Sequence, residues 1–176
     1  ILMKYLVKFF VVTIFVLFCT HAFAEQKIVV MNLKEVLNSS KAGKEAQEFL
    51  KKKFNTKQKE FSEQEKKLKD EESGLLGKKA SMTKEDYKKE SEKLRKRVLK
   101  YQTDRRNALE DIAQQRASAR SELLKKLDPI LNNHVKENGI SLIIDKKNVI
   151  AGSVDNDITS IIIDQLNKDL PSLNLK

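Results

Sequence analysis

Two sets of apolar residues repeat every seven positions on either side of a short interruption, and this pattern constrains the fold more than any other feature. Each set is typical of one helix of a coiled coil. The chain has no proline between positions 41 and 128, and it is rich there in residues that favour helices. The repeats are Phe54, Phe61, Leu68 and Leu75, then Tyr87, Leu94, Tyr101 and Ala108.

Folding the chain back around Ser81 brings the two repeats into register, which predicts an antiparallel helical hairpin. Gly77 is placed to end the first helix, and Thr83 with Asp86 to cap the second, so we expect the reversal near residues 76–82. The two helices would then share one apolar seam. Its predicted pairs are Leu75 with Tyr87, Leu68 with Leu94, Phe61 with Tyr101, Phe54 with Ala108, and Leu50 with Ile112.

The hairpin, residues 41–126, is too long to fold into a compact body. A helix over residues 41–75 would extend on the order of 50 Å, so we expect the hairpin to protrude as an arm. Gly43 lies near the base of this arm, opposite Ala119 in the same register. The hypothesis that the arm flexes there predicts that Gly43→Ala leaves any oligomer intact.

The two ends of the mature chain, residues 25–40 and 127–176, are expected to form one small hub. Short β-branched runs at residues 28–31 and 141–145 predict buried strands, and residues 149–151 predict a third. We expect Pro129 to kink or end the second long helix, which stops near Gly139. A last helix is predicted with Asp155 to Asp157 at its start and an apolar face of Ile158, Ile161, Ile162 and Leu166.

The predicted fold class is therefore α+β, mostly α, with a helical arm on a strand-containing hub. The hub has no aromatic residue and no cysteine. So small a core is marginal alone, and exposed strand edges favour pairing between copies. The residues predicted to form the hub or the contact between copies are Ile28, Val30, Leu142, Ile143, Ile144, Val149 and Ile150.

The first 24 residues have the pattern of a cleaved secretory signal. Lys4 and Lys8 precede an apolar run from Phe9 to Phe18, and Ala22-Phe23-Ala24 supplies the cleavage site. Cys19 is the only cysteine of the chain and lies within this segment. The exported product is thus expected to have no disulfide and to depend on packing and association for its stability.

Positive charge is concentrated in the predicted arm. Residues 41–126 hold 26 basic and 16 acidic residues, whereas residues 127–176 have a net charge of −2. This distribution is typical of a surface that meets acidic partners or an anionic membrane, although a solvated helix face gives the same pattern. The candidate contacts to an anionic surface are Lys78, Lys79, Lys84, Lys88, Lys89, Lys93, Arg95, Lys96 and Arg97.

The whole mature sequence resembles the OmpH/Skp family of periplasmic chaperones. The resemblance rests on the signal peptide, on residues 28–32 leading into a helix, on the long basic hairpin, on residues 142–150, and on Asp157-Ile158-Thr159 before a last helix. It implies a periplasmic homotrimer whose arms surround a cavity. It also implies that unfolded outer-membrane β-barrel proteins are held there without ATP. The basic residues near the arm tip separately predict anionic lipid or lipopolysaccharide as a further partner.

The resemblance implies neither a cofactor nor a catalytic residue, and the sequence shows no motif for a phosphate loop, a nucleophile or a metal site. The heptad stripe is interpreted as the seam between the two helices, with a client-binding wall as the alternative. Client contact is then predicted at residues beside the seam, which are equally typical of ordinary coiled-coil flanks. These candidates are Phe49, Val98, Leu99 and Leu109.

Two other classes of function fit parts of the sequence. A basic helical protein also suits nucleic-acid binding, but a signal peptide argues against it. A structural coiled-coil spacer is the other alternative, and it predicts arms zipped into one rod rather than splayed around a space.

Overall fold

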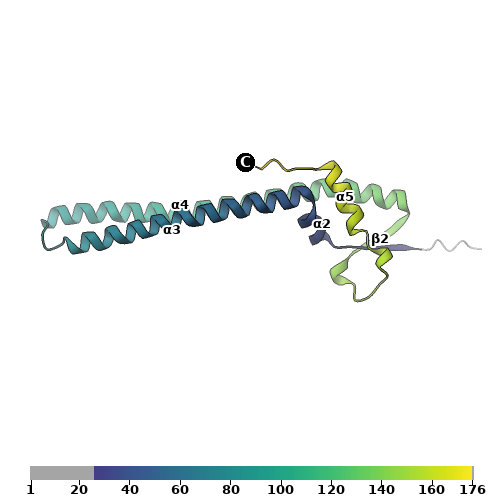
Figure 1. Cartoon of the computed structure of the whole chain (residues 1–176), viewed down its shortest axis with the longest axis horizontal. Coiled ribbons are helices and arrows are strands. Elements are labelled where there is room, and N and C mark those ends of the chain that lie inside the picture. Colours follow the sequence, from purple (N-terminus) through teal and green to yellow (C-terminus); the bar gives the residue numbers. More distant parts are fainter. Residues whose placement is uncertain (1–25, 176) are drawn as a thin grey trace, which may run out of the picture.

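The computed structural model describes residues 26–175. The predicted signal peptide and its cleavage site lie outside the described residues. A long hairpin of two helices projects from a small hub, in which elements from the N-terminal and C-terminal parts of the described chain pack together (Figure 1). The hub contains strands β1 (Lys27–Met31) and β2 (Ile140–Asp145) and helices α2 (Leu33–Ser39) and α5 (Thr159–Asp169). The predicted fold class, mostly helical with a small strand-containing hub, is confirmed.

The arm consists of α3 (Lys41–Gly77) and α4 (Lys84–Asn138). At 1.5 Å per residue, the 37 residues of α3 extend about 55 Å. Thr83 caps α4 as predicted, because its hydroxyl accepts a hydrogen bond from the Asp86 amide at 3.1 Å. The helix continues through Pro129 and ends at Gly139, whose φ of 61° lies in the left-handed region that glycine tolerates best.

A break at Ser40 separates α2 from α3, and sequence periodicity alone did not predict it. Asn32 caps α2 by accepting from the Glu35 amide, and Ser40 caps α3 by accepting from the Gly43 amide at 3.2 Å. Ser40 has an extended backbone, with φ −60° and ψ 153°. The chain therefore turns at this residue, which we call the elbow, before it enters the arm.

The sheet is smaller than predicted, since it has two parallel strands, β1 and β2. Residues 149–151 do not form the expected third strand. A 3-10 turn at Lys146–Asn148 is followed by an irregular loop, and the Ile150 side chain is fully exposed. β1 instead receives one bridge from Asp157, next to the Ile158 amide that donates to the Val30 carbonyl at 3.0 Å.

The core of the hub lies between the sheet, α2, α5 and the hub end of α4. Val36, Ile162 and Leu166 are completely buried there. Ile161 was predicted on the inward face of α5 but is 47% exposed, so that prediction is wrong. These elements bury their apolar side chains in one shared core, and this core holds the hub end of the arm in place.

Candidate functional site

The predicted seam runs along the contact between α3 and α4. Leu50, Leu68 and Ile112 are buried in it. The rings of Phe61 and Tyr101 meet edge to face, with their centroids 5.9 Å apart and an interplanar angle of 72°, a favoured geometry for aromatic pairs. The half-buried members of the predicted seam are Phe61, Leu75, Tyr87, Leu94, Tyr101 and Ala108.

Polar groups extend the contact around the aromatic pair. The Tyr101 hydroxyl donates to Glu65 at 3.3 Å, and Lys69 pairs with the same carboxylate at 2.8 Å. The hydrogen bond from Lys69 and its positive charge lower the pKa of Glu65, while burial and the nearby Glu65 charge raise the pKa of Tyr101. Further toward the hub, a hydrogen bond from Lys53 lowers the pKa of Asp111 across the two helices.

Phe54 does not follow the seam prediction. Its side chain is 40% exposed, although it was expected to pack opposite Ala108. In a hairpin of two helices, no third element covers the margin of the seam. The bulky Phe54 ring lies at this margin and therefore stays partly open to solvent. Phe54 is therefore available for contact with another molecule.

The four candidate client-facing residues divide into two kinds. Leu99 and Leu109 on α4 are 54% and 43% exposed, whereas Phe49 and Val98 are half-buried. Leu109 lies beside Arg105 and Arg106 in a shallow depression of α4. The arm thus displays isolated apolar side chains among cations.

The candidate anionic-surface residues are exposed at and near the tip of the arm. Three of them contact other side chains of this part of the arm. Arg97 pairs with Glu71 on the opposite helix, Lys93 pairs with Glu90, and Lys79 lies 5.7 Å from the centre of the Tyr87 ring. Exposed pairs of this kind contribute little to stability, so the tip remains a cationic surface.

The predicted hub residues lie mainly on the open face of the sheet. Paired residues of parallel strands point to the same side, and Val29 faces the core opposite Ile143. The other side is apolar and uncovered, with Ile28 43% and Leu142 52% exposed. This surface, which we call the open sheet face, is formed by Ile28, Val30, Leu142 and Ile144.

Of the remaining hub predictions, Val149 is half-buried in the loop after β2 and Ile150 projects from it. Val154 in the same loop is 85% exposed and was not predicted. The loop is tied back by Asp157, whose carboxylate pairs with Lys146 at 2.6 Å and accepts from the Thr159 amide at 2.9 Å. Burial would raise the pKa of Asp157, but these hydrogen bonds outweigh it and lower the pKa to about 2.

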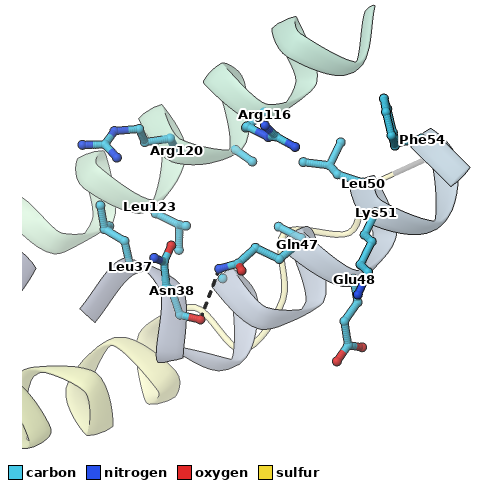
Figure 2. A pocket seen from close by; sticks show the side chains of 13 residues that line it. Leu37, Asn38, Gln47, Glu48, Leu50, Lys51, Phe54, Arg116, Arg120 and Leu123 are labelled. Carbon is cyan, nitrogen blue, oxygen red and sulfur yellow. Dashed lines mark hydrogen bonds between the residues drawn. The ribbon is translucent and has the colours of Figure 1, made fainter. Parts of the chain in front are cut away.

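A groove of about 680 Å³ opens where the arm joins the hub (Figure 2). We call it the arm-base groove. Leu37 and Leu123 lie toward one end and Phe54 at the other, with Leu50 between them. Its apolar lining and size are in the range of binding pockets, roughly 300–1,000 Å³.

Two arginines, Arg116 and Arg120, lie on the α4 side of the arm-base groove. Arg116 points toward Leu50, and Glu48 on α3 points away from α4 (Figure 2). Within residues 26–175, neither arginine has an ion-pair partner. Sequence reasoning missed both residues; the signal was their spacing of four on α4, beside the predicted contact of Leu50 with Ile112.

Residues 26–175 lack the features of two other kinds of site. No group of three or more His, Cys, Asp or Glu side chains in this part of the chain is placed to hold a metal ion. None of its helices combines the length and apolar character needed to cross a membrane.

Comparisons with known proteins agree on one family. The model of the OmpH family, described as outer membrane protein (OmpH-like), matches residues 27–166. A Skp-like protein of Pseudomonas aeruginosa is 25% identical over 170 residues, which cover 94% of this chain and 99% of that protein. The crystal structure of an OmpH-like outer membrane chaperone from Caulobacter crescentus has the same fold, with a TM-score of 0.78 at 18% identity, covering 89% of this chain and 93% of that one.

Proposed function

The chain belongs to the OmpH family, and from this premise we propose that it is a periplasmic holdase chaperone that binds unfolded outer-membrane β-barrel proteins without ATP. A holdase keeps a client from aggregating by mass action and breaks no bond. The observation that carries the proposal is the arm, which presents exposed apolar side chains among many cations. Such a surface suits an unfolded chain that offers apolar and acidic residues in no fixed arrangement.

The proposal includes a homotrimer whose arms surround a cavity. The open sheet face supports association, because Ile28 and Leu142 are apolar and about half exposed in the single chain. Contiguous exposed apolar patches of this kind mark contacts between proteins. The copy number of three comes from the family resemblance.

Client contact is proposed at the exposed Leu99 and Leu109 and at the half-buried Phe49 and Val98. The tip lysines are proposed to meet anionic lipid or lipopolysaccharide, since each cation near such a surface contributes about 1 kcal/mol at low salt. Export by the signal peptide completes the proposal and would place the chain in the periplasm.

An aggregation assay tests the client surface. An outer-membrane β-barrel protein unfolded in urea is diluted into buffer with the protein, and light scattering is followed over time. We expect the protein to suppress scattering and the double variant Leu99→Ser/Leu109→Ser to do so at least several-fold less effectively. Leu76→Ser is the matched control, because Leu76 is 57% exposed but lies in the last turn of α3, at the tip of the arm. Equal suppression by all three proteins would refute this client surface.

A further inference from the structure

The arm-base groove is an apolar hollow that the seam between α3 and α4 leaves unfilled. Its walls have small side chains where the two helices meet, at Gly43, Ala46 and Ala119. Small residues let two helices approach while filling little of the space beside them. The ring of Phe54 is consequently held at the margin of a hollow and is 40% exposed.

Charge complementarity indicates what the groove binds. Arg116 and Arg120 line it one turn of α4 apart; Arg116 points toward Leu50, whereas Arg120 points away from Leu50, at the end where Leu37 and Leu123 lie (Figure 2). Guanidinium groups pair with carboxylates through two parallel hydrogen bonds and also pack well against apolar and aromatic surfaces. Arg97, farther along α4, already pairs with Glu71, whereas the two groove arginines pair with no carboxylate in the described part of the chain.

We propose that the arm-base groove binds an extended peptide segment in which large apolar side chains alternate with carboxylates. The apolar side chain enters the hollow between Leu50 and Phe54, and the adjacent carboxylate pairs with Arg116. A second carboxylate farther along the segment pairs with Arg120 at the other end of the groove. This inference rests on the proposed holdase function and names the kind of client segment that it recognises first. It also makes the root of the arm, rather than its tip, the specific part of the binding surface.

The test uses three fluorescein-labelled octapeptides with Gly-Ser ends and a central Phe-Glu-Phe-Glu, Phe-Lys-Phe-Lys or Ser-Glu-Ser-Glu segment. Fluorescence anisotropy measures the Kd of each for the full protein. We expect Phe-Glu-Phe-Glu to bind most tightly, and Arg116→Gln/Arg120→Gln to weaken it about tenfold, as loss of one charged hydrogen bond implies. Phe54→Ser should also weaken binding of the Phe-Glu-Phe-Glu peptide. Lys125→Gln/Lys126→Gln removes two charges from exposed positions of the same helix outside the groove and should leave the Kd of this peptide unchanged.

Several results would overturn the inference. If the Phe-Lys-Phe-Lys or the Ser-Glu-Ser-Glu peptide bound as tightly as Phe-Glu-Phe-Glu, the groove would not require both apolar side chains and carboxylates. A changed molecular mass of Arg116→Gln/Arg120→Gln in solution would show that a second copy of the chain occupies the groove. If the variants bind the peptide normally while wild type still suppresses aggregation of an unfolded β-barrel protein, the inference fails and the proposed function stands. If wild type suppresses no aggregation, both fail.

Discussion

Gly43 is the third residue of α3 and lies against the carbonyl of Leu37 at the end of α2. A Cβ atom at this position would be 1.8 Å from the Leu37 oxygen and 2.9 Å from the Ser40 hydroxyl. Gly43→Ala is therefore not a clean probe of arm flexing, because the added Cβ disrupts the elbow itself, and arm flexing stays a prediction. Glycine is needed because the elbow brings two backbones into contact.

Gly43→Ala is predicted to lower the free energy of unfolding of the protein by about 2–3 kcal/mol, since the clash involves backbone that cannot move aside. Urea unfolding followed by circular dichroism at one fixed protein concentration measures the change. Gly74→Ala is the matched control, because a Cβ there meets nothing within 4 Å. It should stabilise α3 by roughly 0.5–1 kcal/mol. Equal midpoints for the two variants would contradict this account of the elbow.

Asp157 predicts a pH dependence of hub stability. Its pKa of about 2 lies below the ordinary value of 3.8, so its charged form stabilises the folded state. The contribution is complete above the unfolded pKa and is lost as the pH falls from about 4 toward 2. We expect Asp157→Asn to remove on the order of 1 kcal/mol at pH 7, after allowance for partial exposure, and almost nothing near pH 2. Thermal unfolding across this pH range measures it; a constant difference would count against the Asp157 contacts.

Among elements, the outer part of the arm has the thinnest packing. Leu68 is the only seam residue beyond Leu50 that is buried in the described α3, and its neighbours along the seam are half-buried. Few buried apolar contacts favour local opening. The arm should therefore be least protected toward its tip.

Leu68→Ala is predicted to destabilise the outer arm by about 2 kcal/mol through the lost apolar contacts. Amide hydrogen exchange should become faster on both helices around Leu68 and Leu94, with little change in the hub. Leu76→Ala is the control, because the Leu76 side chain is 57% exposed. It should change the free energy of local opening by no more than roughly 0.5 kcal/mol. Uniform acceleration across arm and hub would mean that the molecule opens as one unit, contrary to this prediction.

Sequence patterns predicted the elements whose signals are local. The seven-residue repeat, the Thr83 cap and Gly139 each act within a few residues and placed the long helices correctly. The prediction of a third strand at residues 149–151 failed because this β-branched run has no partner strand in the single chain. Ile150 projects into solvent instead. The break at Ser40 lies in the run Asn38-Ser39-Ser40, whose residue types favour helix caps, but sequence periodicity carries no information about such a cap.

The arm-base groove shows the limit of periodicity for a site. A heptad pattern states which residues face the other helix, but it does not state how completely they are covered. Phe54 and Leu50 lie four residues apart, yet the Phe54 side chain is 40% exposed and the Leu50 side chain only 3%. Coverage depends on Ala46 and Ala119, whose small side chains leave the hollow unfilled. Packing between distant segments therefore decided the site.

For the whole molecule, the open sheet face makes a prediction about assembly. Ile28→Ser/Leu142→Ser should weaken association and lower the mass seen by light scattering toward that of one chain, because it places hydroxyls in an apolar contact. Ile161→Ser is the control, since Ile161 is similarly exposed at 47% but lies on α5. An unchanged mass for the double variant would place the contact between copies elsewhere.

In the proposed function, several copies of this chain together hold one unfolded client. Size-exclusion chromatography with light scattering, after dilution of a urea-unfolded outer-membrane β-barrel protein into an excess of the protein, tests it most directly. The account predicts a soluble complex whose mass equals three copies of the chain plus one client, and no pellet. A client that pellets while the protein elutes alone, at the mass of a single chain, would contradict it.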